Sequence, residues 1–398
     1  MLIKLSSRGL RPLSKSSETP FVGRICERFD YPEAARAREI LLARAPVNHL
    51  PRGFRAYLVS DQGAARYESD TYLLAPDQRH LAAGDIVRID PAGRAVATLY
   101  RRLSPSNTFL VTERCDNYCL MCSQPPKERE DSWLVDELID LIPLVDPNTR
   151  EIGITGGEPA LLGERLTALL LMLKQHLPLT GVHVLSNGRR FSDFEFARQV
   201  ASVGHPDLMF GIPIYSDIAE GHDYVVQSIG AFNDTIRGLL NLKRCRVRVE
   251  LRFVIHAGTY ARLPEFATFV ARNLLFVDHV ALMGLELMGF AQANLDALWI
   301  DPLDYQDQLA SAVHILAKAG LKTSIYNHQL CVLQPALRPF ARRSISDWKN
   351  LYFDECDSCS VRHECGGFFA SSTLRRSRGI NPKAASRSPQ ELSLVGLG

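Results

Sequence analysis

The sequence predicts an α/β protein with a parallel sheet, preceded by a small β-rich domain and followed by a cysteine-rich extension. From Thr108 onward, short apolar runs alternate with longer runs at helical spacing, a pattern typical of parallel strands joined by crossover helices. Between Phe21 and Leu103, short strand-like runs are separated by turns. Four cysteines lie beyond the α/β region, which indicates a metal site there.

Six strand–helix units are expected in the α/β region. A helical run after the first strand carries Leu134, Leu138 and Leu141 on one face. The expected strands cover residues 109–111, 152–154, 182–185, 208–214, 247–255 and 279–285. The predicted division of the chain is 1–20 as a disordered N-terminus, 21–104 as the β-rich domain, 105–325 as the α/β domain, 326–373 as the cysteine extension and 374–398 as a disordered tail.

The β-rich segment contains one clear hairpin. Residues 84–100 form two strand-like runs on either side of a turn at Pro91–Gly93. Such a domain could hold a peptide or a partner protein along a free strand edge. It could equally be a structural cap on the domain that follows.

Composition and charge restrict the possible partners. The chain has 46 Lys and Arg against 44 Asp and Glu, a formal net charge of +2, which favours neither nucleic acid nor an anionic membrane as the main partner. It has no apolar run long enough to span a bilayer and no apolar signal core at the N-terminus. The nine cysteines gather near 115–122 and 356–365, as expected for metal ligation in a reducing cytoplasm and not for a disulfide framework.

Three cysteines in eight residues, Cys115, Cys119 and Cys122, follow the first expected strand. They can form a cup of three thiolates. A [4Fe–4S] cluster usually takes four cysteine ligands, so three would leave one iron open. A zinc site lacking one ligand and three unrelated buried cysteines are the alternatives.

A second motif, Gly156-Gly157-Glu158-Pro159, follows the strand at Ile152–Thr155. Glycines at a strand end allow the backbone to approach a ligand closely. A carboxylate beside exposed amides suits a zwitterionic amino acid. Alone, this motif could also be an ordinary tight turn.

Together, C-x3-C-x2-C and GGEP resemble the radical S-adenosylmethionine (SAM) superfamily. The resemblance implies a partial (βα)6 barrel, similar to a TIM barrel, in which Cys115, Cys119 and Cys122 hold the cluster. It further implies that the open iron chelates the methionine moiety of SAM and that Gly156, Gly157 and Glu158 belong to the SAM site. The residue before the third cysteine is usually aromatic in the family. Here it is Met121, whose flexible thioether can cover the same face of the adenine.

Other candidate residues lie at or near the carboxyl ends of the later strands, where barrels of parallel strands have their active sites. The resemblance implies SAM contacts from such positions, and Asn187, Ser216 and Arg252 are the candidates, with His256 and Glu286 as two further positions. The alternative for Asn187 is a plain strand-to-helix turn. The alternative for Arg252 is one polar face of a strand.

The second cysteine group has the spacing C-x2-C-x5-C at Cys356, Cys359 and Cys365, with Cys331 upstream. Four thiolates could bind zinc or an iron–sulfur cluster. The spacing resembles the shortened auxiliary-cluster extensions of radical SAM peptide maturases. In the full version a further cysteine follows, where this chain has Phe369, so one auxiliary [4Fe–4S] cluster is expected, with zinc the lesser alternative.

The amino-acid sequences of the motifs resemble those of one subfamily, the His-Xaa-Ser system radical SAM maturases (HxsC). The similarity lies in residues 113–127, residues 152–159 and Ser346–Asn350 ahead of the C-terminal cysteines. Membership implies a precursor peptide with His-Xaa-Ser repeats as substrate, a second radical SAM maturase as partner, and an electron donor such as flavodoxin or ferredoxin.

The implied reaction is reductive cleavage of SAM to a 5′-deoxyadenosyl radical, which abstracts hydrogen from the peptide. Two other classes are considered. An enzyme acting on RNA should show a basic or aromatic surface, and an enzyme acting on a small molecule would share the same core. A non-catalytic partner subunit would normally lose ligands, whereas this chain keeps all three cysteines.

Overall fold

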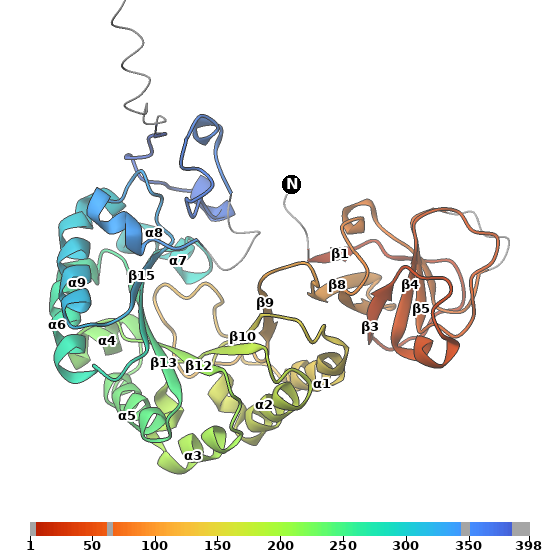
Figure 1. The fold of residues 1–398 in the computed structure, drawn as a ribbon, viewed down its shortest axis with the longest axis horizontal. Helices are drawn as coiled ribbons and strands as arrows, with labels where there is room; N and C mark the ends of the chain where they lie inside the picture. Colours follow the sequence, from red (N-terminus) through yellow and green to blue (C-terminus); the bar gives the residue numbers. More distant parts are fainter. Residues whose placement is uncertain (1–4, 62–66, 344–350, 384–398) are drawn as a thin grey trace, which may run out of the picture. The chain divides into compact units, whose positions relative to one another are not determined.

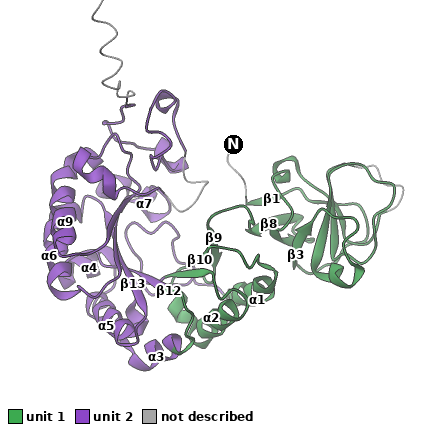
Figure 2. Ribbon diagram, in the orientation of Figure 1, with its two compact units in different colours: residues 1–112, 130–184, 202–208 green, residues 113–129, 185–201, 209–398 purple. Residues whose placement is uncertain are grey.

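The computed structural model describes residues 5–61, 67–343 and 351–383. The chain divides into two compact units, which Figure 2 shows in green and purple. The first unit holds residues 1–112, 130–184 and 202–208, and the second holds residues 113–129, 185–201 and 209–398. None of the helices in the described ranges has the length and apolar character needed to cross a membrane.

The first unit begins with an eight-stranded sheet in the order β1-β8-β7-β3-β4-β5-β6-β2. Figure 1 labels β1, β3, β4, β5 and β8 of this sheet. Its two end strands are separated along the chain only by Gly9 and Leu10. About 10 Å of chain cannot cross an open sheet whose strands lie roughly 4.8 Å apart, so the sheet closes into a barrel. The strands are β1 (Ser6–Arg8), β2 (Arg11–Pro12), β3 (Phe21–Cys26), β4 (Glu39–Ala43), β5 (Ala56–Val59), β6 (Thr71–Leu73), β7 (Ile86–Asp90) and β8 (Ala95–Tyr100).

Apolar side chains from the strands fill this barrel. Leu10, between the two end strands, is buried among them. The rest of this core consists of Ile25, Ile40, Leu42, Ala56, Leu58, Tyr72, Leu74, Leu81, Val87, Ile89 and Val96. Short 3₁₀ turns at Glu33–Arg38 and Pro76–Gln78 connect the strands.

The expectation of a disordered segment at residues 1–20 is wrong for the part that the structure describes. β1 pairs antiparallel with β8, and β2 pairs antiparallel with β6. The segment is rich in serine and arginine, and it is ordered by long-range strand pairing and by burial of Leu10. Local composition does not report either effect.

The expected hairpin is confirmed as the β7–β8 pair, with Asp90 opposite Ala95. The carboxylate of Asp90 accepts a hydrogen bond of 2.9 Å from the N–H of Gly93 and so stabilises the turn. The possibility that this domain holds a peptide or a partner protein along a strand edge stays a prediction.

The first unit also contains three parallel strands, β9 (Asn107–Leu110), β10 (Glu151–Thr155) and β11 (Gly181–Leu185). β10 pairs with both neighbours, so Ile152 lies opposite Asn107 on one side and Val182 on the other. The predicted apolar faces are buried in α1 (Trp133–Leu141) and α2 (Glu164–His176). The 3₁₀ turns here are Ile142–Leu144 and Pro159–Leu162.

Polar contacts attach the small barrel to the α1–β10 segment of the same unit. The guanidinium of Arg102 pairs with Asp146 at 2.7 Å. The hydroxyl of Tyr100 lies 2.7 Å from the hydroxyl of Thr149. Arg88 pairs with Glu137 and lies over the ring of Trp133.

The second unit contains four further parallel strands, with helices α5, α6 and α9 along one side (Figure 1). The strands are β12 (Leu208–Pro213), β13 (Arg248–Ile255), β14 (His279–Gly284) and β15 (Thr323–Tyr326). The helices are α3 (Phe194–Ser202), α4 (Ala219–Val226), α5 (Ala231–Arg244), α6 (Leu263–Asn273), α7 (Phe290–Ala293), α8 (Leu295–Leu298) and α9 (Gln306–Lys318). The 3₁₀ turns cover Arg189–Ser192, Tyr260–Arg262, Pro302–Tyr305, Pro335–Phe340, Asp354–Cys356 and Ala370–Thr373.

All six expected strands are present, and β15 is a seventh that the sequence analysis missed. It pairs parallel with β14, with Val280 opposite Thr323. Four residues directly after a helix are too short a run for a periodicity argument. The parallel α/β character of this region is therefore confirmed, with one more strand than expected.

The predicted disordered tail is ordered as far as Lys383. Ser377 donates a 2.6 Å hydrogen bond to Asp301, and Arg378 pairs with Asp301 and Asp304. The remainder of the predicted tail, residues 384–398, lies outside the described residues. Residues 374–383 are ordered by these contacts with Asp301 and Asp304, at the start of the 3₁₀ turn Pro302–Tyr305. Composition alone does not predict contacts between residues so far apart in the chain.

Barrel closure can be tested with Leu10, which is 3% exposed. Leu10→Ala should destabilise the protein by about 2–5 kcal/mol, because it removes a core side chain between the two end strands. Leu103→Ala is the matched control, since Leu103 is 78% exposed, and its effect should stay within about 0.5 kcal/mol. Chemical denaturation measures both. Equal, small effects would contradict the closed barrel.

Candidate functional site

The cysteine loop of the second unit is shaped by its own backbone. The N–H of Cys122 donates to the carbonyl of Cys119 at 3.0 Å, and the N–H of Asn117 approaches the sulfur of Cys115 at 3.4 Å. Burial raises the pKa of Cys119, and the neighbouring Cys122 and Cys115 raise it further. The three thiols therefore lie close enough to influence one another.

Two other segments of the same unit hold the loop. The N–H groups of Tyr118 and Leu120 donate to the carbonyls of Val226 and Val225 at 3.0 and 2.9 Å, so the loop lies beside the end of α4. On the other side, the N–H of Phe290 donates to the carbonyl of Cys122 at 2.8 Å. Gly289 has φ +57°, and a Cβ there would lie 2.5 Å from that carbonyl, so only glycine allows this close approach.

Side chains from the segment after β11 grip the start of the loop. The Nη1 of Arg189 donates to the carbonyl of Asp116 at 2.9 Å and to Oδ1 of Asn117 at 2.8 Å. The Nδ2 of Asn187 donates to Oδ1 of Asp116 at 2.6 Å. Asn187 was predicted to contact SAM. The structure shows it bonded to the residue next to Cys115.

Met121 is buried in a small apolar cluster with Val225, Ala291 and Leu298. Partly buried members of the cluster include Cys119, Tyr215 and Val254. Burial raises the pKa of Tyr215 well above its usual value, with a further contribution from Cys119. The tyrosine hydroxyl is therefore protonated at neutral pH and lies within electrostatic reach of the cysteine loop.

Ser216 and Arg252 lie after β12 and within β13. The hydroxyl oxygen of Ser216 accepts a 3.3 Å hydrogen bond from the N–H of Ile218, so it supports the local turn before α4. Arg252 pairs with Glu250 at 2.7 Å and stays 22% exposed. Their roles as SAM contacts remain predictions.

His256 is 1% exposed, and its Nδ1 accepts a 3.1 Å hydrogen bond from the N–H of Gly258. Desolvation lowers its pKa to about 4. It is therefore a neutral, buried histidine that supports the backbone after β13. Glu286 follows β14, as expected from the sequence.

The GGEP motif lies in the first unit, directly after β10. The N–H of Gly157 donates to the carbonyl of Thr112 at 2.9 Å. A Cβ on Gly156 would lie 2.5 Å from the same carbonyl, so this position requires glycine. Glu158 is buried, and its Oε1 accepts from the N–H of Ala160 at 2.8 Å, which starts the following 3₁₀ turn.

The four C-terminal cysteines lie together in the second unit. Burial raises the pKa of Cys331, a backbone bond from Asn381 lowers it, and the neighbouring Cys365 and Cys359 raise it again. Burial also raises the pKa of Cys356, with further contributions from Cys331 and Cys365. These mutual effects require proximity, so Cys331 is close to the C-x2-C-x5-C motif.

The comparison with protein families identifies the central region. Residues 109–270, which include the cysteine triplet and GGEP, match the model of the radical SAM superfamily. The chain contains a radical SAM superfamily domain. No curated protein matches the chain.

Several solved radical SAM structures are similar to this chain. One is Streptococcus suis SuiB bound to S-adenosylmethionine, with 12% identity and a TM-score of 0.45 over 56% of this chain and 51% of that chain. The chain thus spans about half the length of SuiB. Another is anSMEcpe with bound AdoMet and the Cp18Cys peptide, with 16% identity and a TM-score of 0.42 over 55% of this chain and 62% of that chain. A third is a radical SAM methyltransferase from Sphaerobacter thermophilus, with 15% identity and a TM-score of 0.40 over 62% of this chain and 74% of that chain.

The radical SAM family implies a [4Fe–4S] cluster and SAM, and the thiols of the loop fit the cluster. No three or more His, Cys, Asp or Glu side chains in the described ranges are arranged to hold one metal ion. In a [4Fe–4S] cluster each cysteine binds a different iron. The chemistry of the thiols and their mutual proximity suit a cluster.

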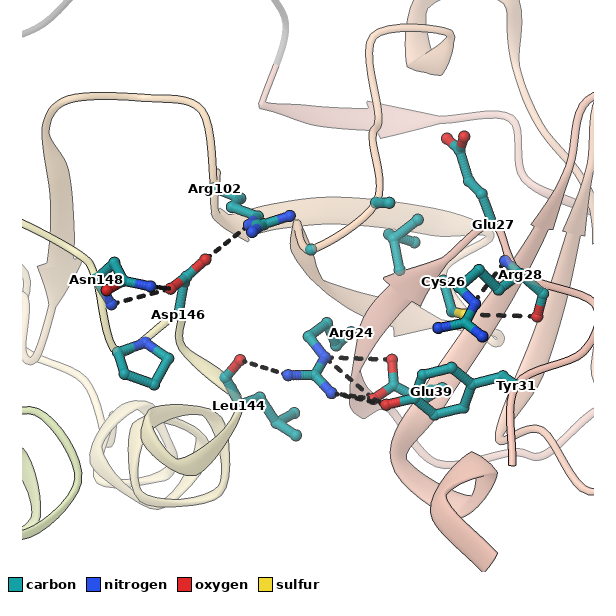
Figure 3. A pocket seen from close by; sticks show the side chains of 14 residues that line it. Arg24, Cys26, Glu27, Arg28, Tyr31, Glu39, Arg102, Leu144, Asp146 and Asn148 are labelled. Carbon is teal, nitrogen blue, oxygen red and sulfur yellow. Dashed lines mark hydrogen bonds and ion pairs between the residues drawn. The ribbon is translucent and has the colours of Figure 1, made fainter. Parts of the chain in front are cut away.

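A cavity of about 330 Å³ in the first unit lies away from all predicted site residues (Figure 3). It is lined by Arg24 with Glu39, Arg102 with Asp146, and the thiol of Cys26, among others. Burial raises the pKa of Cys26, so this thiol is protonated at neutral pH. The cavity therefore presents paired charges and no reactive nucleophile.

Sequence reasoning missed Arg189, Asp116 and Tyr215. Asp116 lies inside the cysteine motif and Arg189 two residues after Asn187, so both were in regions already singled out. Their pairing joins positions more than seventy residues apart. A charged residue within a cluster loop is a signal that a partner elsewhere should be sought.

Removing the arginine that grips the loop should weaken cluster binding. Arg189→Met deletes two hydrogen bonds to the loop, so we expect the iron content after anaerobic reconstitution to fall by about half or more, since positioning of ligands affects metal affinity. The matched control is Arg198→Met, whose exposed ion pair with Glu195 lies elsewhere. Full iron content in Arg189→Met would show that the loop needs no such support.

Stability should fall in mild acid because of His256. Its folded pKa of about 4 lies below its unfolded value of 6.5, so the unfolded chain binds the proton first. The contribution of this residue to stability is present above pH 6.5 and is lost as the pH falls toward 4, by about 1.4 kcal/mol per pH unit.

Chemical denaturation at pH 7.0 and 5.5 tests this prediction. In His256→Asn the side-chain oxygen can still accept the N–H of Gly258, but the group does not titrate. The variant should lose less stability than the wild type between the two pH values. An equal loss in both proteins would contradict the assignment.

Proposed function

We propose that this protein is a radical SAM enzyme that cleaves SAM reductively and modifies a ribosomally made peptide after translation. The observation that carries the proposal is the preshaped loop of Cys115, Cys119 and Cys122. This loop lies inside the matched radical SAM region and is held by backbone hydrogen bonds on both sides.

In the proposal these three thiolates would hold a [4Fe–4S] cluster, and SAM would bind beside it through its methionine moiety. When bound and reduced, this pair supplies one-electron cleavage of SAM and a 5′-deoxyadenosyl radical. The protein orients SAM, excludes water and sets the electrostatic surroundings. Met121, buried beside Cys119, is proposed to cover the adenine.

Gly156, Gly157 and Glu158 are proposed to bind the amino group of SAM. Gly156 brings the backbone close to Thr112, and Glu158 is nearly fully buried. Asn187, Ser216 and Arg252 remain proposed SAM contacts. Since Asn187 already bonds to Asp116, its contribution through the cysteine loop is the better supported of its two roles.

Cys331, Cys356, Cys359 and Cys365 are proposed to hold an auxiliary [4Fe–4S] cluster. The proximity of Cys331 to the other three supports it as the fourth ligand. Four thiolates would leave no iron of this cluster open. Backbone N–H groups of Lys383 and Gly367 approach the sulfurs of Cys359 and Cys365 at 3.4 and 3.5 Å, and such bonds tune a cluster.

The proposed substrate is a precursor peptide. This proposal rests on the similarity of the motifs to the His-Xaa-Ser system maturases, and Ser346–Asn350, part of that similarity, lies outside the described residues. A precursor with His-Xaa-Ser repeats, a second radical SAM maturase and a flavodoxin or ferredoxin are the proposed partners, in the cytoplasm. The near-balanced charge favours a peptide over RNA.

The decisive activity test is formation of 5′-deoxyadenosine from SAM by the reconstituted, reduced protein under anaerobic conditions. The wild type should form it. The Cys115→Ala, Cys119→Ala, Cys122→Ala triple variant should fall to background, because no ligands remain for the cluster. Cys245→Ala removes a cysteine outside both groups and should retain activity.

Co-expression with the candidate peptide tests the substrate. Mass spectrometry should find a mass change in the peptide that disappears with the triple variant. An unmodified peptide despite active SAM cleavage would favour RNA or a small molecule as the substrate. Absence of 5′-deoxyadenosine from a wild type with full iron content would contradict the enzyme and favour a non-catalytic partner subunit.

A further inference from the structure

Three neighbouring strands of the second unit carry a buried chain of hydrogen-bonded side chains. Oε2 of Glu250 on β13 lies 2.6 Å from Nδ1 of His279 on β14. Nε2 of His279 lies 2.9 Å from the hydroxyl of Ser324 on β15. The strand register explains the contact, because Glu250 lies opposite His279 and Ala281 lies opposite Ser324.

The hydrogen-bond directions follow from the carboxylate. Glu250 is 5% exposed, and a buried carboxylate must be paired. The Nδ1–H of His279 therefore donates to Glu250, and the Nε2 of the neutral ring accepts from Ser324. The second carboxylate oxygen, Oε1, accepts the Nη1–H of Arg252 at 2.7 Å. The chain thus runs from Ser324 through His279 and Glu250 to Arg252.

Serine, histidine and glutamate in this order also form the catalytic triads of hydrolases. Two observations argue against that use here. Ser324 is 3% exposed, so a substrate does not reach it. His279 is the first residue of β14 and Glu250 the third of β13, far from the carboxyl ends where barrels carry their chemistry.

Arg252, in contrast, remains accessible. Its Nη2 contacts the sulfur of Met283 at 3.2 Å, and its side chain is 22% exposed. In the described part of the chain, these two contacts engage two of its five N–H donors. The strand partners of Arg252 are Pro213 and Ala281.

The same strand face continues to the cysteine loop. Val254, two residues after Arg252, packs in the apolar cluster that includes Cys119 and Met121. Side chains two apart on a strand share a face. Arg252 therefore places a positive charge next to Val254, on the face of β13 that packs against the cysteine loop.

We infer that Ser324, His279 and Glu250 are positioning residues that fix the guanidinium of Arg252 as an anchor for a carboxylate beside the cysteine loop. A guanidinium held on one side by a buried carboxylate presents its remaining donors in a defined direction. Planar, paired donors match a carboxylate better than any other common anion except phosphate. The inference rests on the proposed function, which supplies a carboxylate-bearing ligand at this loop.

Two ligands could bring that carboxylate, the methionine end of SAM or an acidic group of the substrate. The first arm of the test measures KM for SAM in 5′-deoxyadenosine formation without peptide. Arg252→Met and His279→Phe should raise KM by about tenfold or more, with kcat changed less, as expected for a lost charged hydrogen bond. His279→Gln, which keeps a donor for Glu250, should recover much of the loss.

A SAM analogue without the carboxylate separates anchoring from general damage. Its binding to the reconstituted protein should be equal in wild type, Arg252→Met and His279→Phe if SAM supplies the carboxylate. If KM for SAM is unchanged in the variants, a second experiment measures inhibition by acetate in the wild type and both variants, with chloride at the same concentration as the control. Inhibition by acetate in wild type that is lost in both variants assigns the site to a substrate carboxylate.

Unchanged KM for SAM together with equal acetate sensitivity in all variants would overturn the inference. Iron content must match the wild type in each variant, and His314→Phe and Ser311→Ala on the exposed face of α9 serve as matched controls. Failure of the proposed function is seen separately. In that case the wild type itself holds no cluster or forms no 5′-deoxyadenosine.

Discussion

The grip on the cysteine loop is the constraint on which the functional part of this structure depends. A loop with three thiols can adopt many shapes. Backbone bonds from Tyr118 and Leu120 to the end of α4 and the side chain of Arg189 select one shape. The end of α4, the start of α7 and the segment after β11 supply the fixed points for this shape.

The chemistry-bearing groups are placed by different means. In the GGEP turn, the absence of a side chain at Gly156 lets the backbone approach Thr112. In the C-terminal group, Ser377 and Arg378 bind Asp301, and farther along the same segment the N–H groups of Asn381 and Lys383 lie at the sulfurs of Cys331 and Cys359. On β13, a buried polar chain directs one arginine. In each of these three places, contacts with the rest of the fold fix the orientation of the group.

Much of this organisation could be predicted from the sequence, because it depends on patterns among residues close together in the chain. Helix faces such as that of α2 and six of the parallel strands follow from periodicity, and the cysteine groups and GGEP follow from spacing. Long-range pairing was not predictable. The barrel closure through β1 and β2, the seventh strand β15, the ordered segment at Ser377 and the pairing of Arg189 with Asp116 depend on partners far away in the chain. Local composition carries no record of such partners.

We propose that both cysteine groups hold four-iron clusters. The most direct test of this proposal is the iron and zinc content of the anaerobically purified full chain, compared with the Cys356→Ala, Cys359→Ala variant. The account predicts about eight irons and no zinc in the wild type, and about four irons in the variant. Four irons with one zinc would make the C-terminal site structural. Absence of iron from the wild type would contradict the account as a whole.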